Sequence, residues 1–141
     1  MRFLLDTNVV SEPLRPRPAA GVLRWLHEVD ESQTFLSAIT LGELRYGVER
    51  LPPSRKRSVL EAWVAGDISH RFAGRILSLE GNVCEQWGRF LALSEQRGRP
   101  IGVADALIAA TAAAHGLTLV TRDTADFGVL NVPLFNPWDL D

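Results

Sequence analysis

The sequence predicts one α/β domain built on a short parallel sheet of four or five strands, with helices on both faces. Short, continuously apolar segments alternate with longer segments of helical periodicity, in the order strand, helices, strand. Strands that are apolar throughout are typical of a parallel sheet covered on both sides. The 141 residues match the usual size of one domain, and no repeat or linker divides them, so we expect a single domain over residues 1–141.

The first elements follow from apolar patterning and helix-capping residues. A strand is expected at Arg2–Leu5, and it ends at Asp6–Asn8, where all three residue types favour the start of a helix. A short helix over Val9–Leu14 follows, and a proline-rich segment ends it. Apolar residues on one face of Ala19–Glu28 predict a second helix.

The middle of the chain predicts a strand and two helices. The strand is expected at Thr34–Leu36. Ser37 is suited to cap a helix over Ala38–Arg50, which two consecutive prolines end. Ser54 is suited to cap the next helix, expected over Arg55–Ala65.

The last elements alternate strand and helix. A third strand is expected at Arg75–Leu79 and a helix at Asn82–Gln96. Gly102–Ala114 is a helix of small residues, which leads into a fourth strand at Leu117–Val120. Val132–Phe135 is expected to be a fifth strand at a sheet edge, where a proline is tolerated.

Composition narrows the class of protein. Hydrophobic residues make up 46% of the chain, but no apolar run reaches the roughly 20 residues of a membrane helix, and the N-terminus does not resemble a signal peptide. The single cysteine, Cys84, excludes an internal disulfide and suits a reducing cytoplasm. Cys84 shares a helical pattern with Trp87 and Leu91, which predicts a buried core thiol. We expect a cytoplasmic protein without membrane contact.

Four acids fall where a parallel sheet places its ligands, beyond the carboxyl ends of the strands. Asp6 follows the first strand and Asp123 closely follows the fourth; Glu43 and Asp105 lie near the starts of two helices. Carboxylates that converge repel and raise one another's pKa, and a hard divalent cation such as Mg²⁺ or Mn²⁺ offsets that cost. Such a cation, with an activated water, hydrolyses phosphodiesters.

Each of these acids also has a purely structural interpretation. Asp6 is a good helix N-cap, and Asp123 suits a turn. Glu43 has capping-box spacing from Thr40, although Ser37 is the better cap. Asp105 is expected near a helix N-terminus, where the helix dipole stabilises an acid. Placement alone leaves these interpretations open.

The motifs around the acids resemble those of PIN-domain toxins of the VapC class, and two further segments look closest to its FitB branch. The resemblance covers nearly the whole chain, in the family's order and with every acid present. The segments that carry it are Leu4–Glu12, Ser37–Gly47, Phe72–Leu77, Ala104–Ala112, Leu119–Phe127 and Phe135–Trp138.

This resemblance implies a fold, a site and an activity. The fold is a PIN domain, and the activity is endonucleolytic cleavage of RNA that depends on Mg²⁺ or Mn²⁺. Asp126 is implied as an auxiliary ligand, and Thr7, Asn8 and Thr121 as side chains that orient carboxylates or water. The implied catalytic and metal-binding acids are Asp6, Glu43, Asp105 and Asp123.

The resemblance also implies partners. The chain is expected to be a homodimer that forms a larger complex with a small antitoxin, and the antitoxin supplies the only contact with DNA. The net charge of −2 does not locate an RNA-binding surface. The arginines named as candidates are Arg45, Arg50, Arg71 and Arg75.

A non-catalytic binding module is the rival hypothesis, either a degenerate PIN domain or a receiver-like signalling domain. A degenerate PIN domain normally lacks one of the acids, and none is missing here. A receiver needs a lysine beside its acidic pocket, but Lys56, the only lysine, lies in the wrong region. A phosphatase of the haloacid-dehalogenase type needs a second Asp where Asn8 stands. Stabilisation of the fold by a divalent cation distinguishes a real metal site from these alternatives.

Overall fold

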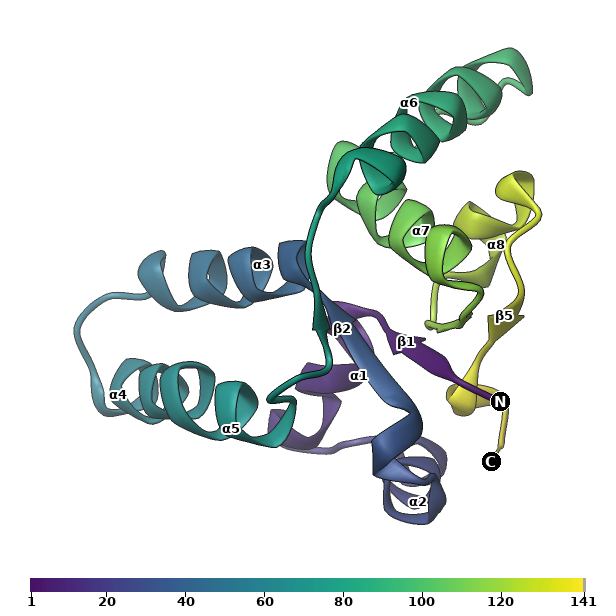
Figure 1. Cartoon of the computed structure of the whole chain (residues 1–141). Helices are drawn as coiled ribbons and strands as arrows, with labels where there is room; N and C mark the ends of the chain where they lie inside the picture. The colour runs from purple at the N-terminus through teal and green to yellow at the C-terminus, as the bar shows by residue number, and fades with distance from the viewer. Residues whose placement is uncertain (141) are drawn as a thin grey trace.

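Parallel strands form a single five-stranded sheet at the centre of the protein, in the order β3-β2-β1-β4-β5 (Figure 1). The computed structural model describes residues 1–140. Every pairing between neighbouring strands is parallel, as the sequence predicted. The strands are β1 (Phe3–Leu5), β2 (Thr34–Ser37), β3 (Ile76–Leu77), β4 (Thr118–Val120) and β5 (Leu134–Phe135).

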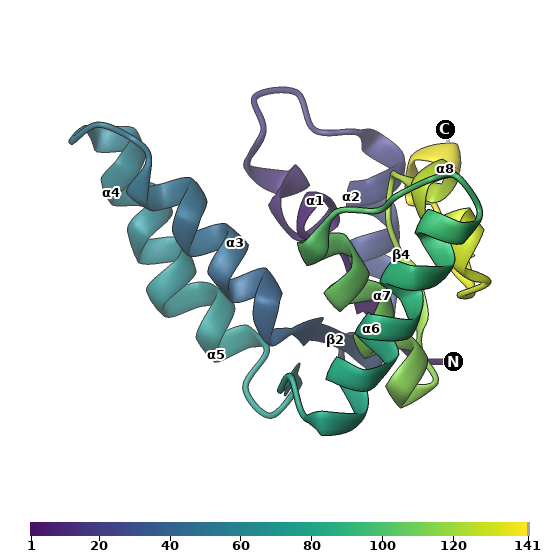
Figure 2. The same ribbon diagram turned by 90° about the horizontal axis from the view of Figure 1, so that it is seen from above.

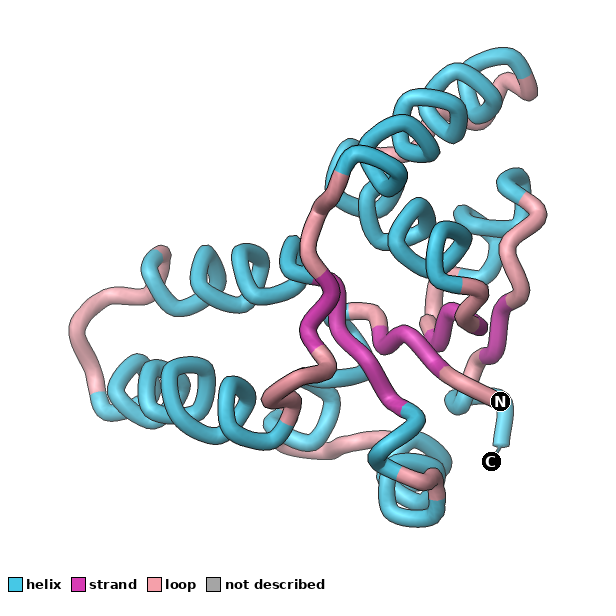
Figure 3. The backbone as a smooth tube through the Cα atoms, in the orientation of Figure 1, coloured by secondary structure: helices cyan, strands magenta, loops and turns pink. Residues whose placement is uncertain are grey.

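Helices account for most of the remaining chain (Figure 3). Short 3-10 segments at Glu12–Leu14, Glu31–Gln33, Gly128–Leu130 and Pro137–Leu140 join or follow several of the elements. The α-helices are α1 (Thr7–Ser11), α2 (Ala20–Glu28), α3 (Ala38–Glu49), α4 (Arg55–Ala62), α5 (Ser69–Arg71), α6 (Gly81–Gln96), α7 (Val103–His115) and α8 (Thr124–Phe127).

Two hydrophobic cores lie on opposite faces of the sheet because successive strand residues point to opposite sides. Leu4 and Leu119 pack with α6, α7 and α8 on one face. Leu5 and Val120 pack with α1, α2, α3 and the α4–α5 segment on the other. Figure 1 shows α6 and α7 on one side of the strands, α1 and α2 on the other, and the α3–α5 hairpin beyond β2. Figure 2 shows from above how α3 lies alongside α4 and α5 in this hairpin. The prediction of helices on both faces is confirmed.

The boundaries of several elements differ from the sequence predictions, and β5 keeps two of its four predicted residues. α1 begins at Thr7, two residues earlier than expected, because Asp6 takes the N-cap position. The helix expected to end at Ala65 continues through a π-helical turn into α5, since Val64 and Ile68 are both buried four residues apart. β3 keeps two of its five predicted residues.

Cys84 is exposed, so the prediction of a buried core thiol is wrong. The buried face of α6 is formed by Val83, Phe90 and Ser94. Cys84 follows Val83 directly, and one residue turns an α-helix by about 100°. The thiol therefore lies to the side of the buried face. Its Sγ lies 3.7 Å from the backbone oxygen of Leu79.

Candidate active site

Asp6 lies at the carboxyl end of β1 and is only 4% exposed. The backbone N–H of Thr7 donates to Oδ1 at 2.8 Å, and the hydroxyl of Thr121 donates to Oδ2 at 2.8 Å. Thr121 directly follows β4, the neighbour of β1, so the sheet itself brings these two side chains together. Asp6 is an N-cap, as the structural interpretation held, and its carboxylate is also fixed in one orientation.

Glu43 faces α1 from the second turn of α3. Its Oε1 accepts a hydrogen bond from the Thr7 hydroxyl at 2.5 Å. Ser37 occupies the N-cap position of α3 and accepts from the N–H of Ile39, so Glu43 has no capping role. Thr7 thus joins two of the acids, since its N–H binds Asp6 and its hydroxyl binds Glu43.

Asp123 is exposed and lies in the turn between β4 and α8. The Asn8 amide donates to its Oδ2 at 3.2 Å. Its own N–H donates to the Thr121 hydroxyl at 3.0 Å, so Thr121 connects the Asp123 backbone to the carboxylate of Asp6. Asp123 makes no side-chain cap to α8, which leaves its carboxylate free of that duty.

Asp105 and Asp126 lie on the α7–α8 side of the site. Asp105 is half-buried in the first turn of α7, and Asp126 is exposed on α8. Both line a cavity of about 210 Å³ beside the loop that joins α6 to α7. Arg99, on that loop, lies 3.7 Å from the Asp126 carboxylate.

Burial and mutual repulsion oppose the ionisation of two of these acids. Burial, with repulsion from Asp105 and Glu43, raises the pKa of Asp6 to about 6 despite the lowering effect of its two hydrogen bonds. Burial also raises the pKa of Asp105, with repulsion from Glu43, Asp123 and Asp126. The carboxylates predicted as ligands therefore share one electrostatic neighbourhood.

The chemistry of these groups fits a hard cation, but the structure holds no preformed cage. Carboxylate oxygens are the ligands that Mg²⁺ and Mn²⁺ prefer. The Asn8 Oδ1 adds a buried amide oxygen that has no hydrogen-bond partner within residues 1–140. In the same part of the chain, no three acidic, histidine or cysteine side chains lie close enough to hold one ion together. The assignment of the four acids as ligands stays a prediction.

Comparison with known proteins decides the family. The family model described as "PIN domain" matches residues 3–130, which is most of the chain. This chain belongs to the PIN-domain family. The matched range contains all the predicted acids and the three side chains predicted to orient them.

This PIN domain is similar over almost its full length to named bacterial proteins. It is 44% identical to toxin FitB of Neisseria gonorrhoeae over 136 residues, which cover 96% of this chain and 98% of FitB. It is 36% identical to VapC ribonuclease Y4jK of Sinorhizobium fredii over 137 residues, 97% of this chain and 98% of the relative. A solved structure of FitAB bound to an IR36 DNA fragment aligns with a TM-score of 0.92 at 42% identity, covering 99% of this chain and 97% of that one.

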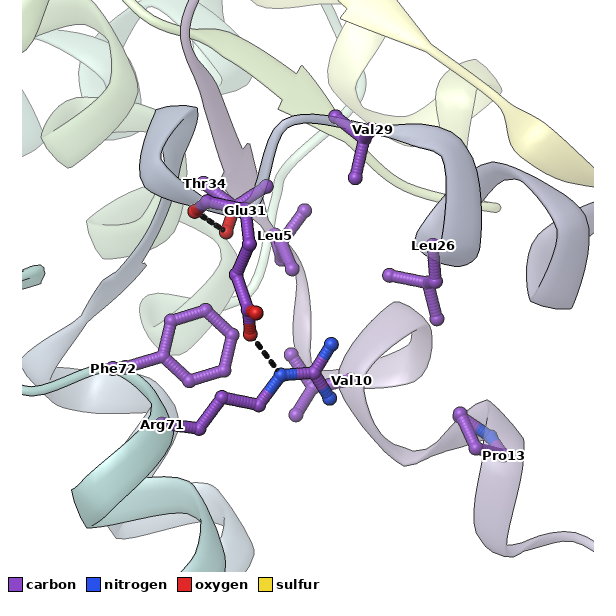
Figure 4. Close-up of a pocket in the computed structure, with 9 residues that line it drawn as sticks. All are labelled: Leu5, Val10, Pro13, Leu26, Val29, Glu31, Thr34, Arg71 and Phe72. Atoms are coloured by element: carbon purple, nitrogen blue, oxygen red, sulfur yellow. Dashed lines mark hydrogen bonds and ion pairs between the residues drawn. The ribbon is translucent and has the colours of Figure 1, made fainter.

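Arg71 and Arg75, two of the predicted RNA contacts, lie away from the predicted acids. Both lie by the amino end of β2, whereas the acids lie at the carboxyl edge of the sheet. Arg71 pairs with Glu31, as Figure 4 shows, and Arg75 donates to the backbone oxygen of Thr34 at 2.6 Å. Both side chains thus hold the turn before β2, and contact of either with RNA stays a prediction.

The two other arginine candidates follow Glu43 in the chain: Arg45 lies on α3, and Arg50 is the C-cap of that helix. Arg45 forms an ion pair with Glu61 at 2.5 Å and lies 3.8 Å from Glu49, so acids already engage its guanidinium. Arg50 lies over the Tyr46 ring at 5.7 Å from its centroid. Contact of either residue with RNA stays a prediction.

The sequence analysis did not single out Arg99, which forms an ion pair with Asp126 in the structure. Its signal was its position, directly before the Pro-Ile-Gly segment that leads into the helix carrying Asp105. The contact with Asp126 brings together residues 27 positions apart, which the sequence pattern did not reveal.

Proposed function

We propose that this protein is a divalent-cation-dependent endoribonuclease that acts as the toxin of a bacterial type II toxin–antitoxin system. It hydrolyses RNA phosphodiester bonds in the cytoplasm with a water activated by Mg²⁺ or Mn²⁺. Membership of the PIN-domain family supports this proposal, together with the similarity to a VapC ribonuclease and to toxin FitB. Within residues 1–140, no helix is long and apolar enough to cross a membrane.

One observation carries the proposal: the acids oppose one another's ionisation at the carboxyl edge of the sheet. A carboxyl group that is 4% exposed and has a pKa of about 6 costs free energy when it is ionised at neutral pH. Perturbed groups clustered at a strand end are typical of functional sites. A bound divalent cation offsets the repulsion and the burial of charge.

The cation, when bound, would activate water, polarise the phosphoryl oxygen and neutralise the leaving oxygen. The ligands proposed to hold it are Asp6, Glu43, Asp105 and Asp123, with Asp126 as an auxiliary. Thr7 and Thr121 fix the orientation of the Asp6 carboxylate, and Asn8 holds that of Asp123. These contacts restrict the motion of the Asp6 and Asp123 carboxylates before any cation arrives, which lowers the cost of the rotations that would assemble the site.

We propose further that the protein works in a complex with an antitoxin. The similar solved structure is of FitAB bound to DNA, and it aligns over 99% of this chain. By that similarity, the chain forms a homodimer, the homodimer joins a larger assembly with its antitoxin, and only the antitoxin contacts DNA. Light scattering after size-exclusion chromatography of the chain, alone and co-expressed with the antitoxin, tests both stoichiometries. A chain that stays monomeric in both samples contradicts the homodimer.

The test of function is RNA cleavage by the purified protein with and without Mn²⁺. Wild type is expected to cut RNA with the metal and not with EDTA, and Asp6→Asn and Asp105→Asn are expected to be inactive but folded. The matched control is Asp67→Asn, which removes an exposed acid from the π-helical turn. Conditional expression, with mapping of new RNA 5′ ends for wild type against Asp105→Asn, identifies the target. Cleavage that persists in Asp6→Asn overturns the proposal.

A further inference from the structure

A polar cavity of about 210 Å³ extends the acidic site along the start of α7. The α6–α7 loop forms one side of it, and the first turn of α7 and α8 supply its acids. Val103 is 61% exposed at the same end of α7. The residues that line the cavity are Arg99, Pro100, Ile101, Gly102, Asp105 and Asp126.

Arg99 supplies the positive charge of this cavity, and it is loosely held. Its Nη2 lies 3.7 Å from the Asp126 Oδ1, and the two side chains are 60% and 61% exposed. An exposed ion pair at this separation contributes little to stability and is weakened by salt. The guanidinium can therefore leave Asp126 for a stronger anion without cost to the fold.

Neighbouring arginines are engaged elsewhere. Arg97 donates to the backbone oxygen of Val129, and the Arg122 guanidinium lies over the Trp138 ring at 5.5 Å from its centroid. Within residues 1–140, Arg99 is the base that forms an ion pair with one of the acids implicated in the site.

An acidic site that cleaves RNA must hold a polyanion against its own charge. A bound cation would neutralise the scissile phosphate, but the adjoining phosphates would meet Asp105 and Asp126, which line the cavity. A guanidinium at the rim, which can donate two parallel hydrogen bonds to phosphate oxygens, removes that repulsion. The exposed Val103 offers an apolar surface for the ribose or base between the two phosphates.

We propose that Arg99 binds an RNA phosphate that flanks the scissile one, so that the RNA strand runs through the cavity along the start of α7. This inference rests on the proposed ribonuclease function and adds a substrate contact to the four arginine candidates from the sequence. Arg99 exchanges Asp126 for the phosphate when RNA binds.

The test measures binding of a short, fluorescein-labelled single-stranded RNA of mixed sequence in EDTA, across a series of salt concentrations. The variants are Arg99→Gln, Arg99→Lys and Arg89→Gln, the last of which removes an exposed arginine of α6 that does not line the cavity. Arg99→Gln is expected to weaken binding several-fold. It should also reduce the slope of log affinity against log salt by about 0.7, the value of one single-strand phosphate contact. Arg99→Lys should keep the slope, and Arg89→Gln should match wild type.

The outcomes separate this inference from the function on which it rests. An Arg99→Gln protein with wild-type affinity and salt slope overturns the phosphate contact, even if wild type cleaves RNA. If Arg99→Gln instead weakens only the complex with the antitoxin, the residue belongs to a protein interface and the inference is wrong. Wild type that binds RNA through Arg99 but never cleaves it refutes the proposed function alone. Wild type that fails to bind RNA refutes both.

Discussion

Asp6 carries the clearest physical signature of function in this protein. The sequence places it after a buried strand, and burial, with repulsion from neighbouring acids, raises its pKa to about 6. The folded protein therefore holds the neutral form of Asp6 more tightly than the unfolded chain does. At neutral pH the ionised carboxylate destabilises the metal-free fold, and this is a cost that function explains and packing does not.

Replacing Asp6 by Asn should stabilise the metal-free protein at neutral pH. Asn keeps the capping oxygen and removes the buried charge. A shift from 3.8 to about 6 corresponds to at most about 3 kcal/mol at about 1.36 kcal/mol per pKa unit, so a gain of roughly 1–3 kcal/mol is expected. Urea unfolding at pH 7 in EDTA measures it, with Asp67→Asn as the control. A destabilised Asp6→Asn protein contradicts the buried-charge account.

The Thr7 hydroxyl should matter through Glu43. Thr7→Val keeps the shape of the side chain but removes the donor to Oε1 of Glu43, whereas Thr7→Ser keeps that donor. Loss of one charge-assisted hydrogen bond predicts cleavage about tenfold slower in Thr7→Val, equivalent to about 1.4 kcal/mol. Single-turnover cleavage rates for the two variants measure the effect. Equal rates in Val and Ser variants show that Thr7 does not position Glu43.

At the scale of elements, Ser37 links the helices that carry two of the acids. It caps α3 and accepts a hydrogen bond from the Thr111 hydroxyl of α7 at 3.1 Å. Ser37→Ala should therefore cost about 1–2 kcal/mol and also slow cleavage, because α3 and α7 lose a buried contact. Ser54→Ala removes the cap of α4 and should cost about 1 kcal/mol while cleavage stays at the wild-type rate. Chemical unfolding and cleavage assays compare the two variants. Equal effects on cleavage would show that the contact of Ser37 with α7 does not contribute to the active site.

The sequence predicted the elements well where one local pattern was sufficient. Apolar runs located every strand, and Ser37 and Ser54 correctly marked the starts of α3 and α4. α8 was missed because its four residues are too short to show helical periodicity. The positions of Arg71 and Arg99 depend on which segments meet in space, and nothing in the local sequence around them encodes the contacts with Glu31 and Asp126. The position of the acids after parallel strands predicted that they would repel one another. It did not predict that their side chains would lie too far apart to hold one ion together in the described residues.

For the whole molecule, stability should depend on both pH and metal. Because Asp6 has a raised pKa in the folded state, its favourable contribution is complete below its unfolded pKa of 3.8 and is lost as pH rises through about 6. The advantage of Asp6→Asn over wild type should therefore grow between pH 4 and pH 7. Thermal unfolding in EDTA across this range measures the difference between the two proteins. If the advantage of Asp6→Asn shrinks as the pH rises, the pKa of Asp6 is not raised in the folded state.

Binding of a divalent cation should restore the stability that the fold loses when Asp6 ionises. A cation bound only to the folded state stabilises it by about 2.7 kcal/mol at 100 times its dissociation constant. Mn²⁺ should therefore raise the melting temperature of wild type at pH 7, raise it less at pH 5 where the Asp6 proton competes, and raise that of Asp6→Asn little at either pH. Equal shifts in both proteins place the metal elsewhere.

The most direct test of the shared cation site is the anomalous diffraction of a crystal grown with Mn²⁺. The account predicts a peak among Asp6, Glu43, Asp105 and Asp123, with the carboxylates rotated inward to bind the ion and the Thr7 and Thr121 hydrogen bonds to Asp6 retained. Saturating Mn²⁺ with no peak at this edge of the sheet, or with a peak bound only by acids outside this group, contradicts it.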